Sequence, residues 1–256
     1  MIPEDVWNEI KKVIPQKQPG SVGRPASDEW RILSGVLFVV RAGIQWKYLP
    51  EIYGPPSTVH GRFIKWVECG VFSEITHTAR QFYQGQEWFD EFWLAIDTSH
   101  SKAPFAVEGG KNPTDRGKRG VKRIVVTDRR GAPLAVCVAP SNTHDSKLLK
   151  MALEALGIDS VPNYIILTAD SAFDAKKLRA HCKKMGVILV ASTNVRRRKG
   201  VEKIRVKGRE VVERTFGIQA WYRGLKICWT KRLDTFLAFL QLASSLQLFR
   251  MVRIFV

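Results

Sequence analysis

Residues 92–99 read Phe-Trp-Leu-Ala-Ile-Asp-Thr-Ser, five apolar side chains that run into one aspartate and two small hydroxyl residues. An apolar run of this length, with aromatic and β-branched members, predicts a buried strand. A carboxylate at the end of such a strand is costly to desolvate unless it is paired or binds a cation. Asp97 is therefore the first candidate for a functional residue.

A second stretch repeats this design, because residues 164–171 read Tyr-Ile-Ile-Leu-Thr-Ala-Asp-Ser. Two buried strands that each end in an aspartate can bring Asp97 and Asp170 together at one edge of a sheet. Two carboxylates that lie close together repel each other, and a divalent cation relieves the repulsion. The alternative is that each aspartate only opens a turn or caps the following helix. The two stretches alone leave both interpretations open.

The charge of the chain indicates a polyanionic partner. The sequence contains 41 Lys and Arg against 24 Asp and Glu, for a formal net charge of +17. Residues 111–130 and 196–209 carry sixteen of the basic residues. This concentration favours a surface that binds nucleic-acid phosphates over a generally basic, solvated surface. An acidic membrane surface is the weaker alternative.

The pattern of the chain changes near residue 88, and we expect a helical domain over 1–88 and a catalytic domain over 89–256. Residues 27–84 predict helix, turn and helix, a module that could place Thr58, His60, Arg62 or Lys65 against DNA. The alternative is a purely structural helical cap.

After residue 92 the pattern predicts a strand, two β-rich runs over 121–128 and 133–139, and a helix over 145–156. A strand ending at 170, a helix over 174–185, a strand over 187–191 and helices from 210 and over 234–251 follow. This order predicts an α/β fold, a mixed sheet flanked by helices, and it is the element order of a ribonuclease-H-like fold.

Segments that would anchor the protein to a membrane are not expected. The apolar segment 233–256 is interrupted by Asp234, Arg250, Arg253 and several polar residues, which argues against a membrane span. The acidic start of the chain lacks the apolar core of a signal peptide. We expect a cytoplasmic protein without a membrane partner.

Several motifs carry a resemblance to a known family. They are residues 31–38 and 43–50, the stretch 57–63, the run Gly-Lys-Asn-Pro-Thr-Asp-Arg-Gly-Lys-Arg-Gly at 110–120 and the run Val-Val-Glu-Arg-Thr-Phe at 211–216. With these motifs the chain resembles the DDE transposases of small bacterial insertion sequences, over most of its length. The resemblance implies a ribonuclease-H-like catalytic domain that follows an all-helical domain.

The resemblance assigns an acidic triad to Asp97, Asp170 and Glu213, with two Mg²⁺ or Mn²⁺ ions as the implied cofactors. Related transposases carry a Tyr, Arg, Glu, Lys signature around the third acid. Arg209 fits this signature, but valine and alanine occupy its Tyr and Lys positions, 206 and 220.

Other acids compete for a place in the site. Glu210 lies at the same helix start as the third acid, where either carboxylate could only complement the helix dipole. Asp128 and Asp174 are interpreted as structural. His144 and Asp145 could form an acid–base pair, but a loop histidine beside a helix cap is the preferred interpretation.

The implied function is cleavage of double-stranded DNA at the terminal inverted repeats of an element, followed by transfer of the 3′-hydroxyl into target DNA. The resemblance also implies a homodimer or higher oligomer on DNA and a place in the bacterial cytoplasm, at the nucleoid. Alternatives are a catalytically inactive transposase-derived DNA-binding protein and a ribonuclease-H-like repair nuclease. The residues expected to contact DNA are Lys118, Arg119, Lys122, Arg123, Arg196, Arg197, Arg198, Arg209 and Arg214.

Overall fold

The computed structural model describes residues 1–15, 28–89, 92–157, 164–193, 206, 208 and 210–252. The chain forms two compact units. The first comprises Met1–Gln86, Trp221–Ile227 and Asp234–Val256, and the second comprises Glu87–Ala220 and Cys228–Leu233.

The second unit is built on a mixed sheet. In the described part of the chain its strands are β1 (Trp93–Lys102), β2 (Gly110–Lys111), β3 (Arg119–Asp128), β4 (Pro133–Pro140), β5 (Ile165–Ala169) and β6 (Val187–Ala191). The spatial order is β4-β3-β1-β5-β6, and the short β2 pairs with the start of β3. β1, β3 and β4 are antiparallel, whereas β5 and β6 run parallel to β1. This topology confirms the predicted ribonuclease-H-like sheet.

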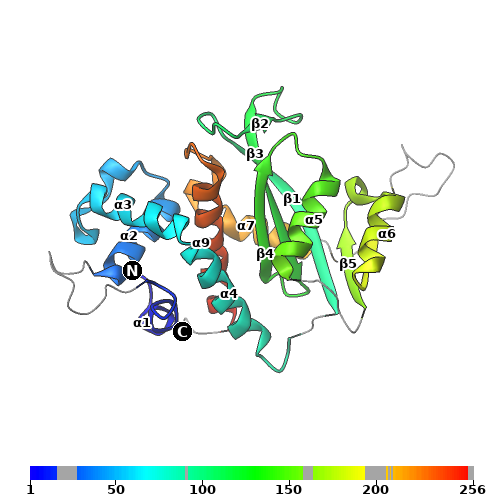
Figure 1. The fold of residues 1–256 in the computed structure, drawn as a ribbon, viewed down its shortest axis with the longest axis horizontal. Coiled ribbons are helices and arrows are strands. Elements are labelled where there is room, and N and C mark those ends of the chain that lie inside the picture. The colour runs from blue at the N-terminus through cyan, green and yellow to red at the C-terminus, as the bar shows by residue number, and fades with distance from the viewer. Residues whose placement is uncertain are drawn as a thin grey trace. The chain divides into compact units, whose positions relative to one another are not determined.

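Helices cover both faces of this sheet. They are α5 (Asp145–Leu156), α6 (Lys176–Lys184) and α7 (Glu210–Gln219). The Cys137 thiol of β4 contacts the carbonyl of Met151 in α5, so α5 lies on the face of Cys137 and its β3 partner Ile124. The residue of β3 before Ile124, Arg123, lies against the Phe216 ring of α7. Because neighbouring residues of a strand point to opposite faces, α5 and α7 cover opposite faces of the sheet (Figure 1).

The first unit is helical. It contains α1 (Glu4–Ile10), α2 (Glu29–Ala42), α3 (Pro56–Glu68), α4 (Val71–Gln84), the short α8 (Arg223–Lys226) and α9 (Leu233–Met251). Phe63 of α3 stacks on Phe239 of α9 with ring centroids 5.0 Å apart. Phe82 of α4 lies 6.0 Å from Phe249 of α9.

The two compact units do not follow the order of the chain, because Trp221–Ile227 and Asp234–Val256 belong to the unit of the N-terminal helices. The last helix, α9, belongs to the compact unit of the N-terminal helices. The physical reason is its sequence, because α9 is buried on nearly all sides and needs apolar neighbours around its whole circumference. Among the described residues, no helix combines the length and the apolar character needed to cross a membrane.

Candidate active site

Asp97 lies inside β1, as the fifth residue of that strand. Leu94, Ala95 and Ile96 before it are buried, and Asp97 itself is half-buried. Its Oδ1 accepts a hydrogen bond of 2.7 Å from the backbone N–H of Thr98. The predicted buried strand before Asp97 is confirmed, but the strand does not end there: β1 continues to Lys102, because its pairing with β3 extends past Asp97.

Asp170 follows directly after β5 and is also half-buried. It caps the short 3₁₀ turn Ser171–Phe173, where its Oδ1 accepts a hydrogen bond from the backbone N–H of Ala172. The capping interpretation thus holds for this residue. Capping does not exclude a metal-binding role, because a carboxylate with one hydrogen bond keeps further lone pairs.

Asp97 and Asp170 occupy equivalent positions after the last paired residues of two adjacent parallel strands. β1 and β5 are parallel, and their last paired residues are Ala95 and Thr168. Two residues further along the same register lie Asp97 and Asp170, just past the point where the two strands stop pairing. Neighbouring strands are about 4.8 Å apart. The two carboxylates thus leave the sheet at the same level, from adjacent strands.

The helix α7 lies over the face of β1 that carries Asp97. Arg123 pairs with Ser99, two residues after Asp97 and on the same face. The guanidinium carbon of Arg123 lies 5.5 Å from the ring centre of Phe216 in α7. At the end of β3, the Thr215 hydroxyl donates a hydrogen bond of 2.6 Å to the carbonyl of Gly131.

Glu213 lies in the first turn of α7, together with Glu210, and both side chains are exposed. Among the described residues, no three His, Cys, Asp or Glu side chains lie close enough to hold a metal ion together. The structure therefore brings Asp97 and Asp170 level with each other, and it does not gather these two and Glu213 into one ligand set. Carboxylate oxygens are nevertheless the donors that Mg²⁺ and Mn²⁺ prefer, so the chemistry of the aspartate pair fits these ions.

The first basic run divides into exposed and buried residues. Lys118 and Arg119 are exposed, as a phosphate-binding surface requires. Lys122 and Arg123 follow in the middle of β3, and their exposed fractions are only 8% and 6%. Adjacent strand residues point to opposite faces, and helices cover both faces, so both side chains are buried. This burial does not support the expectation that Lys122 and Arg123 contact DNA at the surface.

Lys122 takes part in a buried polar cluster. Its ammonium group lies 3.2 Å from Oδ1 of Asp145 and donates to the carbonyl of Thr143, also at 3.2 Å. Nearby, Nδ1 of His100 lies 3.0 Å from the Ser141 hydroxyl. Burial lowers the pKa of His100, and the Lys122 charge lowers it further, whereas Asp145 acts in the opposite direction. Asp145 therefore holds the start of α5 to β3, a role that the sequence interpretation missed.

Arg123 is a buried cation without a carboxylate partner among the described residues. Its Nη2 donates a hydrogen bond of 3.2 Å to the Ser99 hydroxyl. Its Nε and Nη1 are buried and have no hydrogen-bond partner in the described part of the chain. Burial lowers the pKa of Arg123 to about 10. The sequence signal that could have found this site is the two-residue alternation along β1 and β3.

The other acids and bases named from the sequence have defined places. His144 caps α5, where its Nδ1 accepts a hydrogen bond from the N–H of Ser146. Asp174 pairs with Arg179 at 2.9 Å. Asp128 accepts hydrogen bonds from two backbone N–H groups of its own turn. These three residues are structural, as expected.

The remaining candidates for DNA contact are only partly described. Arg214 is exposed on α7, whereas Arg196, Arg197, Arg198 and Arg209 lie outside the described residues. In the helical unit, Arg62 is paired with Glu29 at 3.1 Å. Burial lowers the pKa of His60, whose ring lies 5.0 Å from that of Trp46.

Comparison with known families assigns the chain. Residues 89–248 match the family model described as “Transposase DDE domain”, which spans more than half of the sequence. The chain belongs to the DDE transposase family. Residues 2–76 of this DDE transposase-family chain match a second model, described as “Putative transposase of IS4/5 family”.

Individual relatives share about 30% sequence identity with parts of this chain. The “Putative transposase for insertion sequence element IS402” of Burkholderia cepacia is 31% identical over 144 residues, which cover 54% of this chain and 66% of that protein. “Uncharacterized protein y4sN” of Sinorhizobium fredii is 29% identical over 117 residues, 43% of this chain and 87% of that protein. The chain thus spans slightly less than two thirds of the length of the first relative.

Comparison with solved structures gave matches of low TM-score. A piggyBac transposase synaptic complex with hairpin DNA matches with a TM-score of 0.44 and 10% identity, over 95% of this chain and 71% of that chain. The catalytic core domain of BIV integrase matches with a TM-score of 0.36 and 15% identity, over 61% of this chain and 84% of that chain.

Proposed function

We propose that the protein is a DNA transposase that cuts phosphodiester bonds at the ends of its element and joins the freed ends to target DNA. The observation that supports the proposal is the register of β1 and β5, whose last paired residues, Ala95 and Thr168, each lie two residues before an aspartate, Asp97 and Asp170. Membership of the DDE family supports it. The exposed Lys118 and Arg119 at the start of β3 and the net charge of +17 support a DNA substrate.

The first proposed reaction is hydrolysis. A water oxygen attacks the phosphorus at the element end, and the bond between phosphorus and the 3′-oxygen breaks. The electron pair of that bond leaves with the 3′-oxygen, which takes up a proton and becomes a 3′-hydroxyl. In the second reaction, this 3′-hydroxyl loses its proton, attacks a phosphorus of target DNA and displaces a 3′-oxygen of the target strand.

The site residues have separate proposed roles. Asp97 and Asp170 would hold a divalent cation, Mg²⁺ or Mn²⁺, and Glu213 would contribute the third carboxylate from α7. Two such ions would supply an activated water or 3′-hydroxyl and charge stabilisation for the leaving oxygen. The exposed Lys118 and Arg119 would hold the DNA backbone beside the site. Arg214 and the four arginines outside the described residues remain further proposed contacts.

The proposed partners are double-stranded DNA, as the terminal inverted repeats and as the target, and a second copy of the chain on paired ends. The proposed domain roles are DNA recognition by residues 1–88 and catalysis by residues 89–256. The helical unit offers Lys65 and the residues around it as candidates for recognition.

The test is strand transfer with an end-bearing duplex and Mn²⁺ or Mg²⁺. We expect Asp97→Asn, Asp170→Asn and Glu213→Gln each to bind the duplex like wild type and to lose cleavage. Glu210→Gln is the matched control, because Glu210 is an exposed carboxylate in the same helical turn as Glu213.

Two outcomes would contradict the proposal. Normal cleavage by the Asp97 and Asp170 variants would show that the aspartate pair is not the catalytic centre. A wild-type protein that binds the ends but never cuts them with either metal would instead be a DNA-binding protein derived from a transposase.

A further inference from the structure

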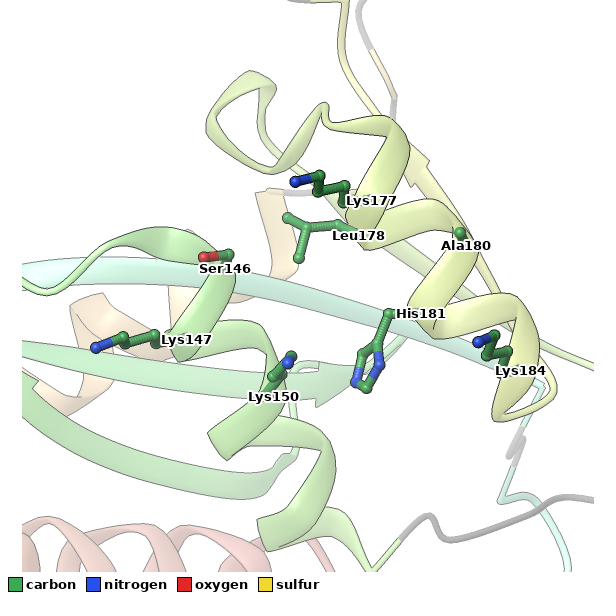
Figure 2. A pocket seen from close by; sticks show the side chains of 8 residues that line it. All are labelled: Ser146, Lys147, Lys150, Lys177, Leu178, Ala180, His181 and Lys184. Carbon is green, nitrogen blue, oxygen red and sulfur yellow. The ribbon is translucent and has the colours of Figure 1, made fainter.

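A groove lies between α5 and α6 in the second unit. It encloses a volume of about 590 Å³. Buried Leu178 is one of its lining residues, and four lysines and a histidine also line it. They are Lys147, Lys150, Lys177, His181 and Lys184. Figure 2 shows that the lysines come from both helices and that the His181 ring points from α6 toward α5.

The spacing of these residues follows from helix geometry. Lys177, His181 and Lys184 are separated by four and three residues, so they share one face of α6. Lys147 and Lys150 are three residues apart on α5 and share a face in the same way. At 1.5 Å per residue, the seven residues from Lys177 to Lys184 span about 10 Å along the axis of α6.

The groove carries uncompensated positive charge. All four lysines are exposed, and among the described residues no carboxylate lines the groove and none of the four makes a salt bridge. Other cations of this unit are neutralised locally, such as Lys122 by Asp145 and Arg179 by Asp174. Four like charges around one hollow repel each other, and an anionic ligand relieves that repulsion.

The chemistry and length of the groove fit the backbone of a nucleic acid. Lysine is a compact point charge that contacts phosphate without reading the bases. The phosphates of one strand follow each other every 3.4 Å along the axis of a duplex, so α6, when it lies along that axis, spans about three of them. The groove belongs to the sheet face covered by α5, whereas Asp97 lies on the face covered by α7.

We propose that the α5–α6 groove is a second, sequence-independent DNA-binding site that holds backbone phosphates of a duplex away from the cleavage site. The proposal rests on the proposed function, because it takes the substrate of the protein to be DNA. The groove would hold a stretch of the duplex that flanks the cleaved bond, or a separate duplex, while the reacting strand lies at Asp97.

The test compares two pairs of substitutions on the same helix. Lys177→Ala with Lys184→Ala removes two charges from the groove. Lys176→Ala with Lys183→Ala removes two exposed charges of α6 that do not line it. Binding of a duplex of unrelated sequence is measured by fluorescence anisotropy over a range of NaCl concentrations.

For the groove pair we expect binding weaker by about tenfold, and a slope of log K against log salt that is smaller by about 2, one for each lost phosphate contact. The control pair should change both quantities much less. Lys147→Ala with Lys150→Ala should repeat the effect of the groove pair from α5. Equal effects of the groove and control pairs would overturn the proposal.

Further measurements distinguish the groove proposal from sequence-specific binding and from the proposed function. The groove pair should weaken binding of an end-bearing duplex by the same factor as binding of an unrelated duplex, and a loss confined to the end-bearing duplex would overturn sequence-independent binding. If wild type cleaves ends and the groove pair binds DNA normally, the groove proposal fails and the proposed function stands. If wild type never cleaves but the groove effect is present, the proposed function fails and the groove proposal stands.

Discussion

The guanidinium of Arg123 lies under the ring of Phe216, with 5.5 Å between the guanidinium carbon and the ring centre. This contact joins β3 to α7, the helix that carries Glu213. The cation is 6% exposed, and two of its nitrogens have no hydrogen-bond partner among the described residues. Unsatisfied buried donors cost free energy. Burial of Arg123 therefore lowers the free energy of unfolding, although its contact with Phe216 holds α7. We interpret Arg123 as a positioning residue for Glu213.

Arg123→Met should lower the cleavage activity of the protein without lowering its stability. The methionine keeps an apolar contact with Phe216 and removes the unsatisfied donors, so the free energy of unfolding should stay equal or rise, by up to about 3 kcal/mol. With the proposed role of Glu213, cleavage at saturating DNA should fall about tenfold to a hundredfold, because the flexible methionine lacks the cation–π contact that fixes Phe216 and the start of α7. Urea unfolding and end cleavage measure the two quantities. A variant that is less stable than wild type, or that cuts normally, would contradict the positioning role.

Gly131→Ala should disturb the start of α7 through a steric contact. Gly131 has a φ of +84°, and an added Cβ would lie 3.1 Å from the Thr215 hydroxyl and 3.2 Å from the Val211 carbonyl. Gly117→Ala is a matched control, because its φ is +72° and an added Cβ would meet nothing within 4 Å. Left-handed backbone alone costs about 1–2 kcal/mol per residue.

The free energy of unfolding should therefore fall by this amount in both glycine variants, and it should fall further in Gly131→Ala. Only Gly131→Ala should also reduce end cleavage, because only this substitution displaces α7. Thermal unfolding and cleavage assays on the two variants test the prediction, and equal losses of stability would show that the contact with Thr215 relaxes without cost.

The sheet was predictable because its signals are local. Apolar runs that end at Asp97 and Asp170 mark β1 and β5, and the β-rich runs on either side of Gly131 mark β3 and β4. The order of these elements along the chain then favours one topology. The partner of α9 was not predictable in this way, because an apolar helix shows only that it must be buried, not which helices bury it.

The site was predictable only in part, for a similar reason. Lys122 and Arg123 belong to a basic run that predicts a solvent-exposed surface. In the structure they occupy neighbouring positions of a strand that is covered on both faces. Burial of a charged residue depends on packing elements that are distant in sequence. The groove between α5 and α6 was missed because Lys147 and Lys150 are separated from Lys177 by the whole of β5.

His100 should make the stability of the protein depend on pH. Burial is the main reason that its pKa lies below the ordinary value of 6.5 in the folded protein. Below about pH 6.5 the unfolded chain therefore takes up a proton that folded His100 does not, and the free energy of unfolding falls as the pH is lowered. The contribution is fully present above pH 6.5. It is lost as the pH falls through the folded pKa.

His100→Gln should weaken this dependence. Urea unfolding at pH 7.5 and pH 5.5 gives the loss of stability on acidification for each protein, and the loss should be smaller for the variant. His60, whose pKa is also lowered by burial, is unchanged in both proteins and cancels in the comparison. Identical losses would show that His100 does not contribute.

Phe239→Ala should test whether α9 is an integral part of the helical unit. The Phe239 side chain is 5% exposed, stacks on Phe63 at 5.0 Å and lies 6.2 Å from the Trp46 ring. Truncation of a buried phenylalanine costs about 3–5 kcal/mol. Phe105→Ala is a suitable control, because Phe105 is 58% exposed and belongs to the other unit, so its truncation should cost much less.

A fragment of residues 1–88 extends the same test. Without α9 this fragment exposes the apolar surfaces around Phe63 and Phe82 that α9 covers in the full chain. We expect it to lack a cooperative thermal transition by circular dichroism, and co-expression with residues 221–256 should restore one. A fragment that folds cooperatively alone would show that α9 is an addition to the helical unit, and a domain boundary near residue 88 would then be sufficient for folding.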